Sequence, residues 1–156
     1  MSVDKEILSY FLEEATDLLD TLTTIGASLK RVGIPNDAES EKLAEFAQKL
    51  NRLIGGTASV GFDKFAPLSR KTAMLAEECA NIKEMTIRLL IMNLNNVIAL
   101  LSECFQNVDA MEEGGGHVNE IEKRVDICLS AVGLRTPEVK NQNEIDDLFE
   151  SLTGSG

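Results

Sequence analysis

Apolar side chains recur every three or four positions along most of this chain. Between residues 4 and 30 they stand at Ile7, Leu8, Phe11, Ala15, Leu18, Leu19, Leu22, Ile25 and Leu29. This spacing places them on one face of an α-helix, with polar side chains on the other face. The pattern therefore predicts one long amphipathic helix, which ends at the turn-forming run 33-GIPND-37.

The same spacing predicts two further helices before the middle of the chain. The first begins near Ala38 or Ser40, a residue type suited to cap it, and continues through Leu50 into a pair of glycines. The second covers about residues 64–80, with Pro67 in its first turn, where a missing N–H does no harm.

Two more helices are predicted in the second half. The helix at about 84–109 has the broadest apolar face, so we expect it in the middle of a bundle. Three glycines at 114–116 form a loop, and the last helix covers about 117–133. Because no segment has the pattern of a strand, the predicted fold is all-α: an antiparallel four-helix bundle with an additional fifth helix.

Composition and charge narrow the classes of partner. The chain has 156 residues, of which 44% are apolar, enough for the core of one globular domain. It carries 15 basic and 26 acidic residues, a formal net charge of -11. Contacts to phosphates require clustered Lys and Arg, so this balance argues against nucleic acid or an anionic membrane as the main partner.

Cysteine usage and hydropathy indicate a soluble protein without a metal or cofactor. Cys79, Cys104 and Cys128 are widely spaced and form no CxxC pair, so we expect reduced thiols in the core. The start, 1-MSVDKEILSYFLEEA-15, lacks the charge pattern of a signal peptide. No segment approaches the roughly 20 apolar residues of a membrane span, and we expect a cytoplasmic protein.

The segment 50-LNRLIGGTASVGF-62 places Gly55 and Gly56 together inside a predicted helix. Each glycine costs about 1 kcal/mol there relative to alanine. Two interpretations are open. The glycines either permit close packing against a neighbouring helix or keep the surface low, so that a partner can approach the backbone.

This segment resembles the signature of histidine phosphotransfer (HPt) domains, which is close to HTLKGSSASVGF. The matching positions are Gly55, Ala58, Val60, Gly61 and Phe62. The runs 7-ILSYFLEEATDLLDTL-22 and 65-FAPLSRKTAMLAEEC-79 look like the family's first helix and the helix that follows the signature. The resemblance covers roughly residues 4–132 and implies a four-helix bundle that takes part in bacterial two-component signalling, phosphorelay or chemotaxis.

Two departures from the family concern its chemistry. The phosphoacceptor histidine falls on Asn51, and the lysine that supports the phosphoryl group falls on Ile54. An amide nitrogen is not a nucleophile, because its lone pair is delocalised into the carbonyl. We therefore predict a pseudo-HPt domain that is not an enzyme. The only histidine, His117, is expected to be an exposed loop or cap residue, and its use as a non-standard acceptor is the alternative.

The resemblance also implies a docking surface. In the family, the signature glycine lets the active-site loops of a response-regulator receiver domain approach the helix. Here the partner-binding residues would be Lys49, Asn51, Arg52, Ile54, Gly55 and Gly56. Residues 42–71 carry six basic and two acidic side chains, a net charge of +4, which would attract an acidic receiver site. A scatter of solvated lysines is the alternative reading of that charge.

The expected function is thus a non-catalytic adaptor that binds a receiver domain or a histidine kinase without accepting phosphate. A structural or oligomerising helical bundle is the alternative from another class. A monomer or weak dimer is expected, and the sequence leaves open whether binding inhibits or recruits the partner.

The end of the chain carries a second resemblance. The run 142-QNEIDDLF-149 looks like the receiver-binding peptide of the flagellar switch protein. Within the segment 144–152, Ile145, Leu148 and Phe149 share one face of a short amphipathic helix and complete the predicted partner-binding set. The predicted organisation is a bundle at 1–133 and a mostly flexible tail at 134–156, which would bind in cis or in trans.

Overall fold

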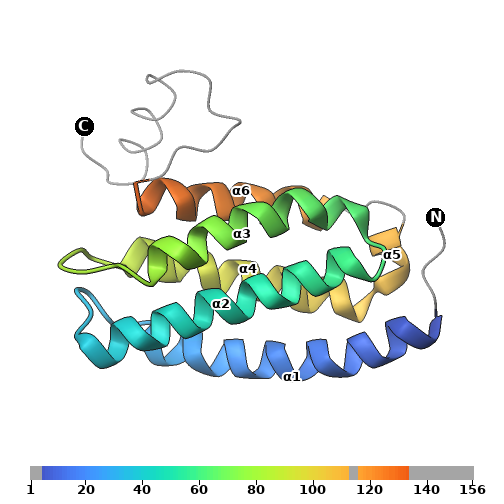
Figure 1. Cartoon of the computed structure of the whole chain (residues 1–156), viewed down its shortest axis with the longest axis horizontal. Coiled ribbons are helices and arrows are strands. Elements are labelled where there is room, and N and C mark those ends of the chain that lie inside the picture. Colours follow the sequence, from blue (N-terminus) through green and yellow to red (C-terminus); the bar gives the residue numbers. More distant parts are fainter. Residues whose placement is uncertain (1–4, 113–115, 134–156) are drawn as a thin grey trace, which may run out of the picture.

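A computed structural model of the protein describes residues 5–112 and 116–133. All regular elements in these two ranges are helical, which confirms the all-α prediction (Figure 1). They are α1 (Lys5–Leu29), α2 (Asp37–Ser59), the short 3-10 helix η1 (Asp63–Phe65), α3 (Ala66–Cys79), α4 (Arg88–Gln106), α5 (Val108–Glu112) and α6 (Gly116–Ala131).

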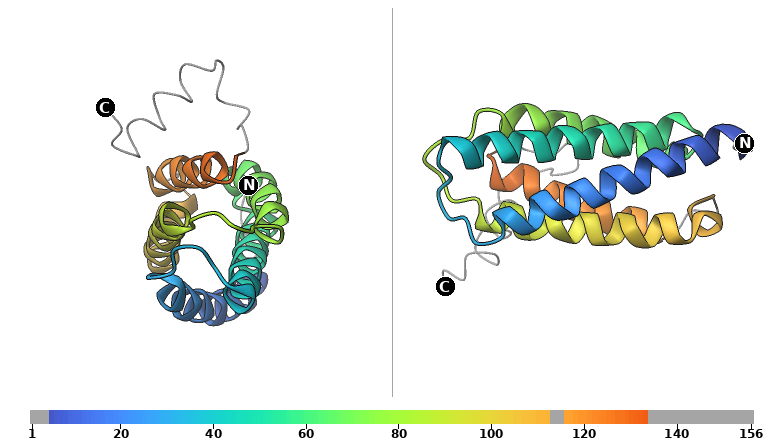
Figure 2. Two further views of the ribbon diagram at one scale, coloured as in Figure 1. Left: turned by 90° about the vertical axis from the view of Figure 1, so that its left-hand side faces the viewer. Right: turned by 90° about the horizontal axis from the view of Figure 1, so that it is seen from below.

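The five long helices form a ring around one core. Helix α1 packs against α2 and α4, α2 packs against α3, and α6 contacts both α3 and α4. The end-on view in Figure 2 shows this ring, and Figure 1 shows that each long helix runs opposite to the one before it in the chain. Helix α6 therefore joins the ring between α3 and α4 and contributes to the shared core.

Helix α2 begins at Asp37, next to Ala38, the earlier of the two starts that the sequence pattern suggested. The Asn36 side chain accepts a hydrogen bond from the Glu39 N–H at 2.8 Å, and the Glu39 carboxylate accepts one from the Asn36 N–H at 2.9 Å. This reciprocal pair is a capping box. The expectation that Ser40 caps the helix is wrong, because the Ser40 N–H already donates to the Asn36 carbonyl within the first turn.

The predicted helix at 84–109 is shorter and divided. Glu84 has a φ of 58°, a left-handed conformation that an α-helix cannot continue, so α4 begins only at Arg88. At its other end, Asn107 has φ -138° and ψ 73°, which separates α4 from the short α5.

Helix α4 buries its broad apolar face in the core but is one member of the ring, and it does not lie in the middle of the bundle as its apolar face suggested. Among the described helices it alone is long and apolar enough to cross a membrane. Its side chains instead pack against α1 and α6. The buried ones are Leu90, Ile91, Asn93, Leu94, Val97, Ile98, Leu101 and Cys104. This burial is typical of the core helix of a soluble protein.

The three cysteines are free and buried, as predicted. Burial raises the pKa of Cys79 to about 12, with a smaller contribution from Glu78. Burial likewise raises the pKa of Cys104 to about 11, and it raises the pKa of Cys128 further. These thiols are therefore protonated core side chains at neutral pH.

Candidate functional site

Gly55 and Gly56 face different neighbours in the bundle. A Cβ atom on Gly56 would lie 2.7 Å from Cε1 of Phe11 in α1, so no side chain fits there unless the ring moves. A Cβ atom on Gly55 would lie 3.4 Å from Oγ of Ser69 in α3, an ordinary contact. Close packing of helices therefore accounts for Gly56 and does not account for Gly55.

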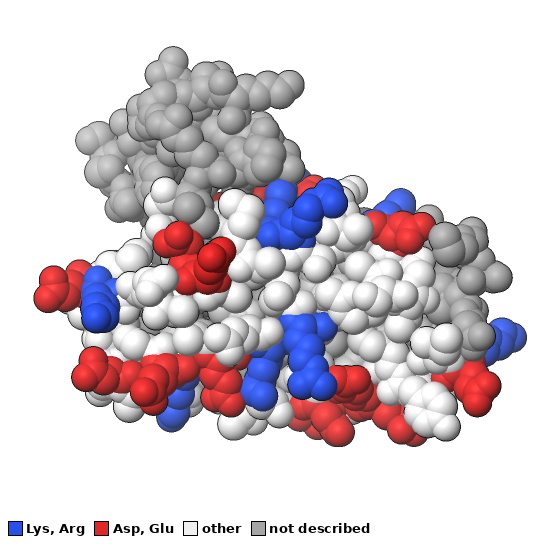
Figure 3. Space-filling view, viewed as in Figure 1, with Lys and Arg blue, Asp and Glu red and all other residues white. Residues whose placement is uncertain are grey.

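Between the side of α2 that faces α1 and the side that faces α3, the helix presents a continuous outer surface. We call it the α2–α3 face and define it by Gln48, Asn51, Arg52, Gly55, Ser59 and Ser69. The α2 members recur at spacings of three and four, so they lie along one side of the helix. Figure 3 shows mostly uncharged side chains over the C-terminal half of α2 and the N-terminal half of α3.

Asn51, the residue expected at the phosphoacceptor position from the resemblance, is hydrogen-bonded to the neighbouring helix. Its side chain is half-buried, and its Oδ1 accepts a hydrogen bond from the Thr72 hydroxyl at 2.9 Å. Thr72 is itself buried, and its hydroxyl also lies 3.0 Å from the Leu68 carbonyl oxygen. Asn51 thus joins α2 to α3 and supplies no nucleophile.

The structure corrects the assignment of Ile54 as a partner-binding residue. Its side chain is 0% exposed, because the spacing of α2 turns this position toward the core with Leu50 and Leu53. A docked protein cannot reach it while the bundle is folded. Gly56 is also better explained within the molecule, since Phe11 fills the space beside it.

Lys71 does not contribute to a basic surface. It is only 4% exposed, and its ammonium group lies 2.9 Å from an Asp126 carboxylate oxygen and 3.3 Å from one of Glu122, both in α6. Its charge therefore stabilises the contact between α3 and α6.

Two basic residues on α2 are also paired with acids. Lys49 lies 3.8 Å from Glu45, one turn earlier, and Arg52 pairs with Glu14 of α1. The remaining exposed bases of the segment are Lys42, Lys64 and Arg70. The positive potential over α2 and α3 is therefore weaker than the sequence suggested, and the low surface at Gly55 is the more distinctive feature.

His117 lies in the first turn of α6 and is exposed, as predicted. Its side chain is 51% exposed, and Nε2 lies 3.2 Å from a carboxylate oxygen of Glu103 in α4. It is not part of the α2–α3 face.

The remaining predicted residues of the site, Ile145, Leu148 and Phe149, lie outside the described residues. Within the described ranges, no group of three or more His, Cys, Asp or Glu side chains is placed to hold a metal ion.

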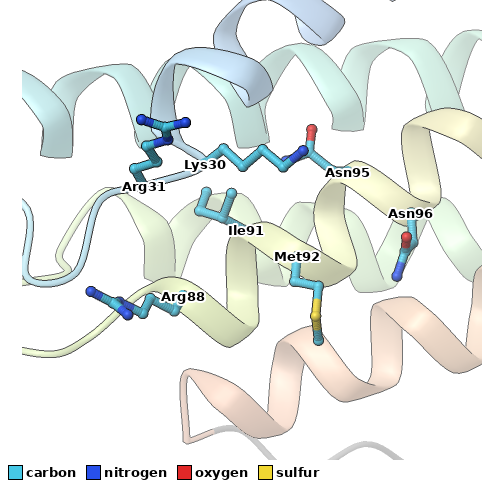
Figure 4. A pocket seen from close by; sticks show the side chains of 7 residues that line it. All are labelled: Lys30, Arg31, Arg88, Ile91, Met92, Asn95 and Asn96. Carbon is cyan, nitrogen blue, oxygen red and sulfur yellow. The ribbon is translucent and has the colours of Figure 1, made fainter.

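A second polar surface was not predicted from the sequence. Lys30, Arg31 and Arg88 line a pocket of about 540 Å³ at the end of the bundle where α1 ends and α4 begins (Figure 4). Because Arg88 stands far from the other two in the chain, no local motif brings the three together.

None of the protein-family models, curated proteins or solved structures with which the chain was compared matches it.

Proposed function

We propose that this protein is a non-catalytic adaptor in bacterial two-component or chemotaxis signalling, with the four-helix-plus-one architecture of an HPt domain. Its α2–α3 face would bind the receiver domain of a response regulator. A histidine kinase is the second partner of the same class. The observation that supports this proposal is Gly55, which carries the helical cost of a glycine although packing leaves room for a side chain.

A glycine at this place lowers the surface between its neighbours. Gly55 is half-buried, with exposed Arg52 and Ser59 one turn away on either side. A partner loop can therefore approach the α2 backbone more closely here than at an ordinary helical position. Arg52, which is exposed, would add a hydrogen-bond donor for an acidic receiver site.

The same residues support binding without phosphoryl transfer. The Asn51 carboxamide is held by Thr72 and is not nucleophilic, and Ile54 presents no cation to a phosphoryl group. The adaptor would act by occupying its partner, and it would inhibit or recruit according to which surface of that partner it covers.

The proposal is tested by measuring the affinity of the full chain for the receiver domains and histidine kinases of its own organism. Gly55→Arg should raise the Kd of the bound partner at least tenfold, a loss of about 1.4 kcal/mol. Ala99→Arg is the matched control, because Ala99 is an exposed position on α4, which does not pack against α2. This variant should bind as tightly as the wild type.

Circular dichroism would verify that both variants are folded. The proposal is wrong if the wild type binds no receiver or kinase, or if Gly55→Arg binds as well as the control. Transfer of acid-labile phosphate to the wild type, and not to a His117→Gln variant, would instead support the phosphotransferase alternative.

A further inference from the structure

The pocket beside α4 is a half-open hollow with an unusual charge environment. It measures about 540 Å³, within the range of sites for small molecules. Lys30 and Arg31 follow the last residue of α1, and Arg88 is the first residue of α4. All three line the pocket, and Figure 4 shows Lys30 extending toward Asn95 while the guanidinium groups of Arg31 and Arg88 point in other directions.

None of these three cations is neutralised by an acid. No carboxylate lines the pocket, and no ion pair joins any of the three to an acid in the part of the chain that the structure describes. The protein as a whole has 26 acidic and 15 basic residues. Three bases at one pocket therefore create a local positive potential on a protein whose net charge is negative.

The three cations stand at helix ends, and the position of Arg88 is unfavourable for its helix. Lys30 and Arg31 stand at the C-terminal end of α1, where a cation interacts favourably with the helix dipole. Arg88 stands at the N-terminal end of α4, where the dipole contributes about half a positive charge and a cation is unfavourable. The first turn of α4 also contains no acidic residue. A bound anion would offset the unfavourable interaction at Arg88.

The walls of the pocket are held in place by the fold. The Ile87 N–H donates to the Gly33 carbonyl at 2.9 Å, which joins the two connecting loops at this end of the bundle. The Arg88 side chain lies against Gly33, where an added Cβ would be 3.7 Å from its Nε. On the other side, Asn95 Nδ2 donates to the Gly26 carbonyl at 3.3 Å. The backbone around the pocket is therefore fixed, and only the exposed side chains of Lys30, Arg31 and Arg88 would have to turn toward a ligand.

The lining changes in character along α4. Arg88 stands at one end, Ile91 and Met92 follow one turn later, and Asn95 and Asn96 lie one turn beyond. These positions span about 12 Å of helix. Met92 is 53% exposed, an apolar surface that faces solvent in the absence of a ligand.

We propose that this pocket binds a nucleoside phosphate. Its phosphates would contact Lys30, Arg31 and Arg88, because guanidinium groups form paired hydrogen bonds with phosphate oxygens. Its ring system would cover the exposed side chain of Met92, and its polar edge would reach the asparagines. Helix α4 packs mainly against α1 and α6, so this site is separate from the α2–α3 face and does not depend on the proposed adaptor function.

The test is isothermal titration of the full chain with ADP and with pyrophosphate at low ionic strength. ADP should bind at least tenfold more tightly than pyrophosphate, since only ADP has a ring system that contacts Met92. Arg88→Gln should weaken both ligands at least tenfold. Lys123→Gln, which removes the same charge from an exposed position on α6, should change neither affinity appreciably.

Met92→Ala separates the nucleoside from a simple anion. It should weaken ADP several-fold and leave pyrophosphate unchanged. Three outcomes would overturn the proposal: no heat of binding with either ligand, unchanged ADP affinity in Arg88→Gln, or equal affinity for ADP and pyrophosphate. Co-sedimentation with phosphatidylglycerol vesicles without any binding of ADP would also overturn it, because the phosphate recognised would then be a lipid headgroup.

Discussion

One added methyl group should have opposite effects at the two neighbouring glycines of α2. Gly55→Ala gains helix propensity, up to about 1 kcal/mol, because Ser69 leaves room for the methyl group. Gly56→Ala should lower the free energy of unfolding by about 1–3 kcal/mol, because the methyl group would displace the buried ring of Phe11. Urea denaturation of both variants measures this. Stabilisation by Gly56→Ala would contradict the close contact with Phe11.

The buried thiols predict a loss of stability in alkaline solution. In the unfolded chain a cysteine has a pKa near 9.0, whereas burial raises the pKa of Cys104 to about 11. Above pH 9 the unfolded state therefore binds fewer protons than the folded state, and the free energy of unfolding falls as the pH rises toward 11. At pH 10 the loss is about 1.4 kcal/mol for such a thiol.

Because alkaline solution affects more than one thiol, the measurement needs a matched variant. Urea denaturation at pH 8 and pH 10 should show a smaller loss for Cys104→Ala than for the wild type, by about 1.4 kcal/mol. Equal losses in the two proteins would mean that the thiol of Cys104 is ionised as readily in the folded state as in the unfolded state.

Between helices, the contact of α3 with α6 should depend on one buried cation. Lys71→Ala removes the cation that lies beside Glu122 and Asp126, and we expect a loss of about 2–4 kcal/mol in the free energy of unfolding. Lys71→Met keeps the volume of the side chain and should cost less. Lys123→Ala, at an exposed position on α6, should change stability by less than about 0.5 kcal/mol. A loss in Lys71→Ala as small as in this control would contradict the buried pairing.

The helix boundaries show how far sequence patterns extend. The periodicity of α1, α3 and α6 located these helices within a few residues, because amphipathic spacing is a local property. The start of α4 was missed, since it depends on the left-handed backbone of Glu84, a conformation that residue type does not predict. The cap of α2 was assigned to Ser40, although Asn36 with Glu39 is the capping box.

For the whole molecule, the ring of helices separates two candidate surfaces. The α2–α3 face lies on one side, and the basic pocket lies on α4 at the end of the bundle. The pair α1 and α4 is joined closely at Gly26, where an added Cβ would lie 2.2 Å from Oδ1 of Asn95. This close approach positions one wall of the pocket, so the pocket is a consequence of how two helices pack.

The amino-acid sequence alone was sufficient for the helical class, for buried reduced thiols and for the absence of a nucleophile at Asn51. Each of these depends on residue type or on spacing along one helix. Only the tertiary structure decided that Gly56 faces Phe11 while Gly55 is left low, and that Lys71 is buried. It also brought Lys30, Arg31 and Arg88 to one pocket. These features depend on contacts between residues distant in the chain, and the period of a single helix does not specify which neighbour each flank will meet.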